Sequence, residues 1–322
     1  MSVSPKAPAV ATGRWSLATF LLVAMWYSTS MLAITTSKMA MQSLKVPLTL
    51  CSAQFLTATM VAGAVMAAQR MPFEVGGWGA AAMLGRVSAA YTLGFFFTNL
   101  AFSMASASFV ETVKSGEPIS TVVLALALLG ERESAVTYAS LLPVVVGVAM
   151  ASAGEAAGGL GAFASTLASN LGFSARAVYA KQLKQKFNSI PSSSSDVCLF
   201  FHISWMGLVV LLPLAVHQET ASWRDALSTE SFSIATFVSV VGLNGLMYTA
   251  YNQFSFMVLS RVDTASHAVL NVCRRVCVIA ATTVFFGTPL SRANVAGIVV
   301  AVMGMCCFTR TKSRPSSAKV KV

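Results

Sequence analysis

Ten long apolar stretches divide the 322-residue sequence, and they constrain its fold more than any other feature. A helix needs about 20 apolar residues to cross a hydrocarbon core about 30 Å thick, and each stretch is close to that length. Strands of a membrane barrel would be about 10 residues long with alternating polarity, a pattern that is absent here. The sequence therefore predicts an all-α membrane protein of ten transmembrane helices. The predicted spans are 15–36, 47–69, 79–100, 103–129, 135–153, 160–181, 197–216, 232–256, 264–286 and 290–309.

The balance of charged and apolar residues agrees with a lipid environment. Charged residues make up 10% of the chain and hydrophobic residues 56%, whereas a soluble domain carries about 25% charged residues. The net charge of +11 lies mostly in predicted loops and tails, where lysine and arginine orient membrane proteins. We therefore expect a lipid bilayer around the spans and no nucleic-acid partner. The six cysteines lie in or beside apolar stretches without metal-ligand spacing, so we expect them to serve packing.

The distribution of lysine and arginine between the spans predicts the orientation in the membrane. Most of these residues fall on one side, and only Lys38, Lys45, Arg224 and Arg292 fall on the other. Positive charge accumulates on the cytosolic side of membrane proteins. The sequence thus predicts cytosolic tails at both ends, over residues 1–14 and 311–322, and no cleaved signal.

The two halves of the sequence show a faint internal repeat. When the chain is displaced by 157 residues, the coincident pairs are Gly130 with Gly287, Ser134 with Ser291, and Gly147 with Gly304. The displacement crosses an odd number of spans, so the two halves would lie in opposite orientations. Inverted repeats are typical of transporters, with the substrate site near the midplane. This register predicts an inverted five-plus-five repeat, with a first half over 15–156 and a second over 157–310.

Five basic residues fall inside predicted spans, and they are Arg86, Lys114, Arg176, Arg274 and Arg275. Each costs at least about 2.5–3.5 kcal/mol at a helix centre, so it should face a cavity or a partner. Glu117, displaced by 157 residues, falls on Arg274, and we expect the two halves to direct charge toward one another. For Arg86 and Arg176 a structural role is favoured.

Pro118 and the cations around it suggest a break in the fourth span and an anion site. Pro118 has no N–H to donate to the carbonyl of Lys114, so the helix can kink there. Irregular backbone in a membrane is tolerated where it lines a polar cavity. Lys114 with Arg274 and Arg275 suits a phosphate, because arginine offers a planar fork and lysine a compact charge. A second interpretation pairs Glu117 with Lys114, three residues away on the same helical face.

Three segments resemble the triose-phosphate translocator family of the drug/metabolite transporter superfamily. "SFVETVKSGEP" is similar to the family pattern around its fourth-span lysine, and "WYSTSMLAITTSK" to the opening of its first span. The most specific segment is "YNQFSFMVLSRVDTASHAVLNVCRRVCVI". The resemblance implies ten helices in an inverted repeat and exchange of a phosphorylated small metabolite for inorganic phosphate, with no catalysis and no cofactor or metal. We expect a monomer or a homodimer.

The same resemblance assigns candidate substrate-binding residues. It implies a phosphate clamp of Lys114, Arg274 and Arg275, with Tyr251 also reaching the phosphate. The residues it implies near the organic end of the substrate are Thr98, Phe102 and the position of Phe95, and Glu117 and His267 also match family positions. Two departures are notable, because plastid members carry histidine where this chain has Phe95 and Glu111. We therefore expect the clamp to be retained and the organic end to differ; for His267, helix packing is an equal alternative.

Two other functions remain open on the sequence. A nucleotide-sugar or nucleoside-monophosphate antiporter of the ER or Golgi would use a related fold, and Phe95 would suit a bulkier ligand. A membrane enzyme or receptor-like protein is the third, but the spans contain no catalytic triad, metal cluster or paired catalytic carboxylates. The membrane itself could be an endomembrane or a plastid envelope.

Overall fold

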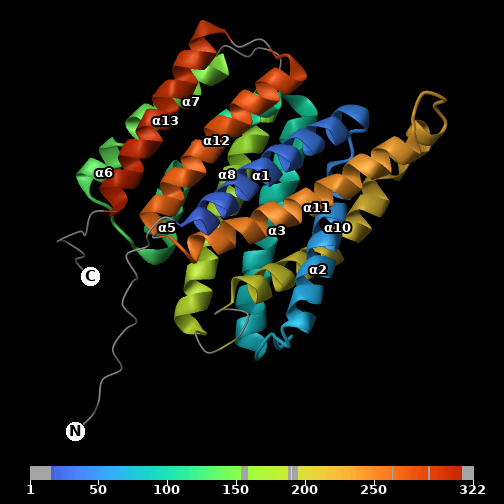
Figure 1. Ribbon diagram of the computed structural model, residues 1–322, viewed down its shortest axis with the longest axis horizontal. Coiled ribbons are helices and arrows are strands. Elements are labelled where there is room, and N and C mark those ends of the chain that lie inside the picture. The colour runs from blue at the N-terminus through green and yellow to red at the C-terminus, as the bar shows by residue number, and fades with distance from the viewer. Residues whose placement is uncertain are drawn as a thin grey trace.

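The computed structural model describes residues 16–153, 159–187, 190, 195–262, 264–288 and 291–313. All regular structure within these ranges is helical (Figure 1). The helices are α1 (Leu17–Ser43), α2 (Pro47–Ala68), α3 (Trp78–Met104), α4 (Ala107–Lys114), α5 (Glu117–Leu129), α6 (Ala135–Ala139), α7 (Leu142–Ala153), α8 (Gly159–Lys186), α10 (Asp196–Leu227), α11 (Ile234–Leu259), α12 (Thr264–Phe286) and α13 (Arg292–Ser313). The predicted tail 1–14 and most of the tail 311–322 lie outside the described ranges.

The prediction of an all-helical membrane protein is confirmed, and the number of spans needs refinement. Eight segments of the described chain are long and apolar enough to cross a membrane. The fifth predicted span contains only a shorter apolar helix, Ala135–Met150. The sixth corresponds to α8, whose serines, asparagine and basic residues lower its hydropathy. Both segments pack against long apolar helices, α7 on α13 and α8 on α3.

Local sequence signals set many of the helix ends. Ser16, Ser106, Ser134 and Ser233 each precede a helix and accept a hydrogen bond from the backbone N–H three residues later, which satisfies one unpaired donor of the first turn. Gly130 ends α5 in the left-handed conformation, with φ of 67°, that glycine adopts without strain.

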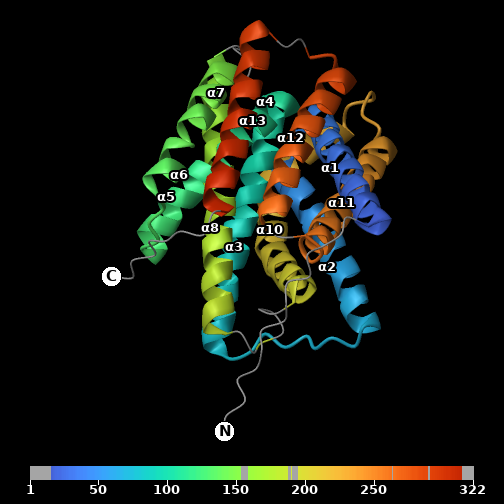
Figure 2. The same ribbon diagram turned by 60° about the vertical axis from the view of Figure 1, so that its left-hand side comes forward.

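The helices pack in pairs that join distant parts of the sequence. The principal neighbours are α3 with α8, α1 with α11, α2 with α10, and α7 with α13. Figures 1 and 2 both show α7 beside α13 at one edge of the bundle and α8 running along α3. Because each pair combines a helix from the first half with one from the second, neither half forms a separate bundle.

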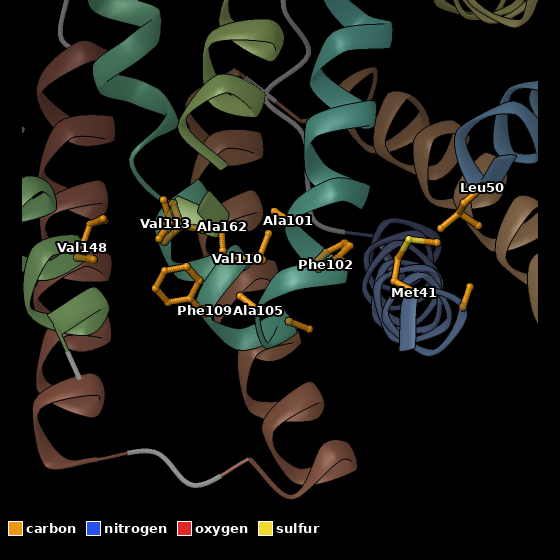
Figure 3. Close-up of a cluster of buried hydrophobic side chains, with 14 of the residues drawn as sticks. Met41, Leu50, Ala101, Phe102, Ala105, Phe109, Val110, Val113, Val148 and Ala162 are labelled. Atoms are coloured by element: carbon orange, nitrogen blue, oxygen red, sulfur yellow. The ribbon is translucent and has the colours of Figure 1, made fainter. Parts of the chain in front are cut away.

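A buried apolar cluster holds α4 in place (Figure 3). Phe109, Val110 and Val113 project from α4 into this cluster, where Phe102 of α3 and Ala162 of α8 also pack. In a membrane, close packing of such side chains holds neighbouring helices together through van der Waals contacts. The apolar face of α4 is thereby fixed, and its charged face is turned toward the neighbouring cavity described below.

Lys38 corrects one detail of the sequence interpretation. We expected Lys38 between spans, but α1 extends to Ser43 and the Lys38 side chain is buried at 9% exposure. Its ammonium donates to the carbonyl oxygens of Phe102 and Ala105, at 2.8 and 2.6 Å. These carbonyls belong to the end of α3, where helix carbonyls lack intrahelical partners and attract a cation. Lys38 therefore fastens α1 to α3.

Two glycines allow α7 and α13 to approach closely. A Cβ built on Gly147 would lie 2.3 Å from the backbone nitrogen of Ala301, and one built on Gly304 would lie 2.7 Å from that of Val144. Both clashes are with backbone atoms, which cannot rotate away. Small residues at a helix interface let membrane helices associate through close packing.

We predict that Gly147→Ala lowers the free energy of unfolding by about 1–3 kcal/mol, the usual effect of overpacking. Unfolding of the purified protein in detergent, followed by circular dichroism, would measure this change. Gly242→Ala in α11 is the matched control, because a Cβ there meets nothing within 4 Å. Equal stability of the two variants would contradict close packing of α7 on α13.

Candidate substrate-binding site

The fourth predicted span breaks where the sequence predicts a kink. α4 ends at Lys114 and α5 begins at Glu117, with Pro118 in its first turn. The N–H of Gly116 donates to the carbonyl oxygen of Val113 at 3.0 Å. Asn170 of α8 donates to the same carbonyl at 3.1 Å, so a neighbouring helix satisfies backbone freed by the break. Lys114 therefore lies at a helix C-terminus and Glu117 at a helix N-terminus, the ends that favour their charges.

The break opens onto a cavity of about 190 Å³. Helices α1, α2, α3, α4, α5, α8, α11 and α12 all contribute to its lining. Eight of the nine candidate residues from the sequence line this one cavity, and they are Phe95, Thr98, Phe102, Lys114, Glu117, Tyr251, Arg274 and Arg275. The three cations of the predicted clamp thus share a single site, although Lys114 is far from Arg274 and Arg275 in the sequence.

Arg275 forms ion pairs with two carboxylates from the other half of the chain. Its Nη2 lies 2.7 Å from Oε2 of Glu117, and its Nη1 lies 3.4 Å from Oε2 of Glu111. The expectation that the two halves direct charge toward one another is confirmed. Glu117 pairs with Arg275, and the interpretation in which it pairs with Lys114 is therefore wrong. The helix break separates Glu117 from Lys114, so the spacing of a continuous helix no longer applies.

Lys114 and Arg274 are buried, and no carboxylate of the described residues is in hydrogen-bond contact with either of them. Lys114 is 8% exposed, and its Nζ donates to Oγ1 of Thr98 at 3.0 Å. The same ammonium lies 4.7 Å from the ring centre of Phe173, a favourable distance for a cation and an aromatic face. Arg274 is also 8% exposed; its Nε donates to Asn271 at 3.0 Å, and its guanidinium carbon lies 5.9 Å from the ring centre of Trp26.

Arg176 of α8 is a fourth cation of the cavity. Its guanidinium carbon lies 5.2 Å from the ring centre of Tyr91. The Nε of Arg176 and the Nε of Arg275 are both buried, and neither has a hydrogen-bond partner among the described residues. A buried guanidinium N–H without an acceptor is unfavourable.

Aromatic rings form another part of the wall. The ring centre of Phe95 lies 4.8 Å from that of Tyr91, 4.8 Å from that of Phe173 and 4.9 Å from that of Tyr248, in edge-to-face arrangements. The hydroxyls of Tyr91 and Tyr248 are hydrogen-bonded at 2.6 Å. Tyr251 packs beside Tyr248, with 5.9 Å between ring centres, and also lines the cavity. Phe95 therefore presents an apolar surface to the cavity.

Two residues that the sequence singled out lie elsewhere. The His267 ring stacks on that of Trp26, with centres 4.8 Å apart, and its Nε2 lies 3.2 Å from Oγ of Ser255. His267 is not part of the cavity lining within the described chain. Arg86 is exposed on α3. The structure thus favours the packing role for His267.

Comparison with known proteins identifies the architecture. The model of the Triose-phosphate Transporter family matches residues 17–309. This chain belongs to that family. A protein of known crystal structure shares the fold, with a TM-score of 0.55 at 16% identity over 91% of this chain and 96% of its own.

Several plastid transporters of this family are similar in sequence. Phosphoenolpyruvate/phosphate translocator 1 of Arabidopsis thaliana is 30% identical over 91% of this chain and 71% of its own length. Glucose-6-phosphate/phosphate translocator 2 of the same plant is 30% identical over 70% of this chain and 58% of its own. Xylulose 5-phosphate/phosphate translocator, also from Arabidopsis thaliana, is 29% identical over 71% and 55%, respectively. The sequence identities are nearly equal and therefore do not distinguish among the substrates in the names of these relatives.

Family membership settles two expectations from the sequence. The resemblance to the triose-phosphate translocator family is confirmed, and so is the expectation that the protein is a transporter and not an enzyme. The nucleotide-sugar alternative is not favoured, because these relatives are named as phosphate translocators.

The sequence did not indicate several uncharged polar side chains that line the cavity of this triose-phosphate transporter family member. These residues are Ser37, Gln54, Asn99 and Asn271. Gln54 donates to Asn244 of α11 at 2.8 Å, and Asn99 donates to Gln54 at 3.1 Å, so buried hydrogen bonds fix their orientation. Asn271 could have been found, because it coincides with Lys114 when the chain is displaced by 157 residues.

We predict that Arg275→Met lowers the free energy of unfolding by about 3–5 kcal/mol, because it leaves Glu111 buried and unpaired. Adding Glu111→Gln and Glu117→Gln should restore much of that loss. Chemical unfolding of the single and triple variants in detergent measures the difference. Lys181→Met, which breaks the exposed Lys181–Glu131 pair, should change stability by about 1 kcal/mol or less. A triple variant no more stable than Arg275→Met would show that the pairing is energetically unimportant.

Proposed function

We propose that this protein is an antiporter that exchanges a phosphorylated small metabolite, such as a triose phosphate, phosphoenolpyruvate or another sugar phosphate, for inorganic phosphate by alternating access. The observation that carries the proposal is the shared cavity of Lys114, Arg274 and Arg275, in which two guanidinium Nε groups have no protein acceptor within the described chain. Four cations and two carboxylates line the cavity, which leaves an excess of two positive charges. A phosphate group carries about −1.5 to −2 at neutral pH and matches that excess.

The phosphate end of the substrate is assigned to the cationic side chains. Lys114 offers a compact ammonium that is held by a single neutral acceptor, Thr98. Arg274 has its Nε engaged by Asn271, which leaves its terminal nitrogens to bind oxygen. Arg275 has its terminal nitrogens engaged by Glu111 and Glu117, and its Nε has no acceptor among the described residues. The hydroxyl of Tyr251 completes the set as a further donor, and Glu117 acts by positioning Arg275.

The organic end is assigned to the wall that includes Phe95, Thr98 and Phe102. Phe95 and Phe102 give apolar contact, and the Thr98 hydroxyl lies between Lys114 and Ser169 at 3.0 and 2.7 Å. This hydroxyl links the cationic part of the lining to the aromatic part. A substrate that fills both parts would contact residues from both halves of the chain, which couples its binding to their relative movement.

The obligatory character of the exchange follows from the excess charge. A cavity without a bound anion retains two uncompensated positive charges, and buried unpaired ions cost several kcal/mol each. A bound phosphate or phosphate ester neutralises them, so the loaded protein can change its orientation far more readily. This requires no coupling ion.

An inverted five-plus-five repeat, over 15–156 and 157–310, is the architecture that we propose for this movement. Exchanging the halves helix for helix, in chain order, turns the α1–α11 pair into the α8–α3 pair, and it leaves α2–α10 and α7–α13 unchanged. Gly130 and Gly287 share left-handed φ values of 67° and 60°. The approach of Gly147 to Ala301 and of Gly304 to Val144 is likewise reciprocal in the same register.

We place the protein in a plastid envelope membrane, with both termini in the cytosol. The chloroplastic relatives support the compartment, and the excess of lysine and arginine on one side of the predicted spans supports the orientation.

The test is counter-exchange in liposomes that contain the purified protein. We predict that vesicles preloaded with phosphate take up labelled dihydroxyacetone phosphate at least about tenfold faster than empty vesicles. A tenfold difference in rate corresponds to about 1.4 kcal/mol, and a single uncompensated buried charge costs several kcal/mol. Lys114→Met should abolish the uptake at unchanged protein level. Lys184→Met is the control, since Lys184 forms an exposed pair with Asp196. Equal uptake by loaded and empty vesicles would overturn the proposal.

A further inference from the structure

We propose that Glu111 makes the site select against substrates that carry a carboxylate in addition to their phosphate. The favoured substrate class is then phosphate monoesters of uncharged, hydroxylated compounds, such as polyol or sugar phosphates. The inference rests on the proposed function and narrows its substrate range.

Glu111 lines the same cavity as the cations. Its side chain is 2% exposed, and it projects from α4 three residues before Lys114. Its Oε2 is 3.4 Å from Nη1 of Arg275, and its charge also acts on Lys114 and Arg274. The negative charge of Glu111 therefore offsets part of the positive charge of all three cations of the proposed clamp.

The charge balance of the cavity gives Glu111 its effect on selectivity. The cations of the lining are Lys114, Arg176, Arg274 and Arg275, and the carboxylates are Glu111 and Glu117. One phosphate monoester, with a charge of about −1.5 to −2 at neutral pH, neutralises the excess of two positive charges. A substrate with an added carboxylate brings a further negative charge that the site does not balance. Without the Glu111 charge the excess would be three, and the added carboxylate would be matched.

The uncharged polar lining favours the same class of substrate. Ser37, Gln54, Asn99, Asn252 and Asn271 offer hydroxyl and amide groups to the cavity. The Nδ2 of Asn99 already donates to Gln54 and to the Cys51 sulfur, at 3.1 and 3.0 Å, so its Oδ1 is the atom that can face a ligand. An amide oxygen accepts a hydrogen bond from a hydroxyl, whereas a carboxylate has no hydrogen to donate.

A matched pair of substrates tests this inference. Glycerol 3-phosphate and 3-phosphoglycerate differ only in a hydroxymethyl group against a carboxylate. Liposomes loaded with labelled phosphate would receive one or the other outside, and the initial rate of phosphate release would be measured for each. We expect the wild type to favour glycerol 3-phosphate roughly tenfold or more, the order of effect of one unit charge at about 8 Å with an effective dielectric constant of about 20.

Two variants isolate the charge of Glu111. Glu111→Gln keeps the shape of the side chain and removes its charge, so the ratio of the two rates should fall roughly tenfold toward 3-phosphoglycerate. Glu111→Asp keeps the charge and should keep the preference of the wild type. An unchanged ratio in Glu111→Gln would overturn the inference.

The wild type alone also decides, should Glu111→Gln fail to fold. Equal rates for the two substrates, or a preference for 3-phosphoglycerate, would overturn the selectivity while leaving phosphate antiport intact. Absence of exchange even between phosphate inside and phosphate outside would instead overturn the proposed function, and with it this inference. The two failures are therefore distinguishable.

Discussion

The structure depends on how a largely apolar bundle accommodates buried positive charge. Arg275 of α12 sits between Glu117 at 2.7 Å and Glu111 at 3.4 Å, and both carboxylates come from the segment around the break between α4 and α5. Burying these ions unpaired would cost several kcal/mol each, so the pairing makes the arrangement possible at all. The ion pairs also link the fourth predicted span to the ninth. Loss of Arg275 would leave the charges of Glu111 and Glu117 unpaired, and loss of both glutamates would leave the charge of Arg275 unpaired. The remaining cations, with weaker protein partners, are then the ones most available to a ligand.

The break in the helix is the structural means by which this is achieved. Pro118 has no N–H with which to continue the hydrogen bonding of α4, and Asn170 from α8 donates to the buried carbonyl of Val113, which also accepts from Gly116. The apolar cluster around Phe109 and Val110 fixes α4 from its other face. An uninterrupted helix would place Lys114 and Glu117 together on one face. The interruption separates them, so that Glu117 turns to Arg275 and Lys114 to Thr98.

Much of this could be predicted from the sequence, and the parts that could not have physical reasons. Lipid demands long apolar helices, so the helices follow from hydropathy, and charges inside spans are too costly to be incidental, so Lys114, Arg274 and Arg275 were found. The partner of Glu117 was not predictable, because helical spacing assumes an unbroken helix. The burial of Lys38 was missed for a related reason, because a count of charges between spans does not register burial against protein. Neutral residues such as Gln54 and Asn99 carry no such penalty, and only the folded chain shows where they converge.

The hydrogen bond between Tyr91 and Tyr248 has a consequence for motion. These hydroxyls are 2.6 Å apart, and the two residues are separated in sequence by 157 positions, the displacement that relates the proposed halves. If the two halves exchange conformations, a contact between two equivalent positions is kept. A contact between positions that are not equivalent is instead replaced by the contact that its symmetry-related residues make. In the proposed inverted repeat, Tyr91 and Tyr248 would therefore lie on the two-fold axis, and their contact would be kept in both orientations of the proposed transport cycle.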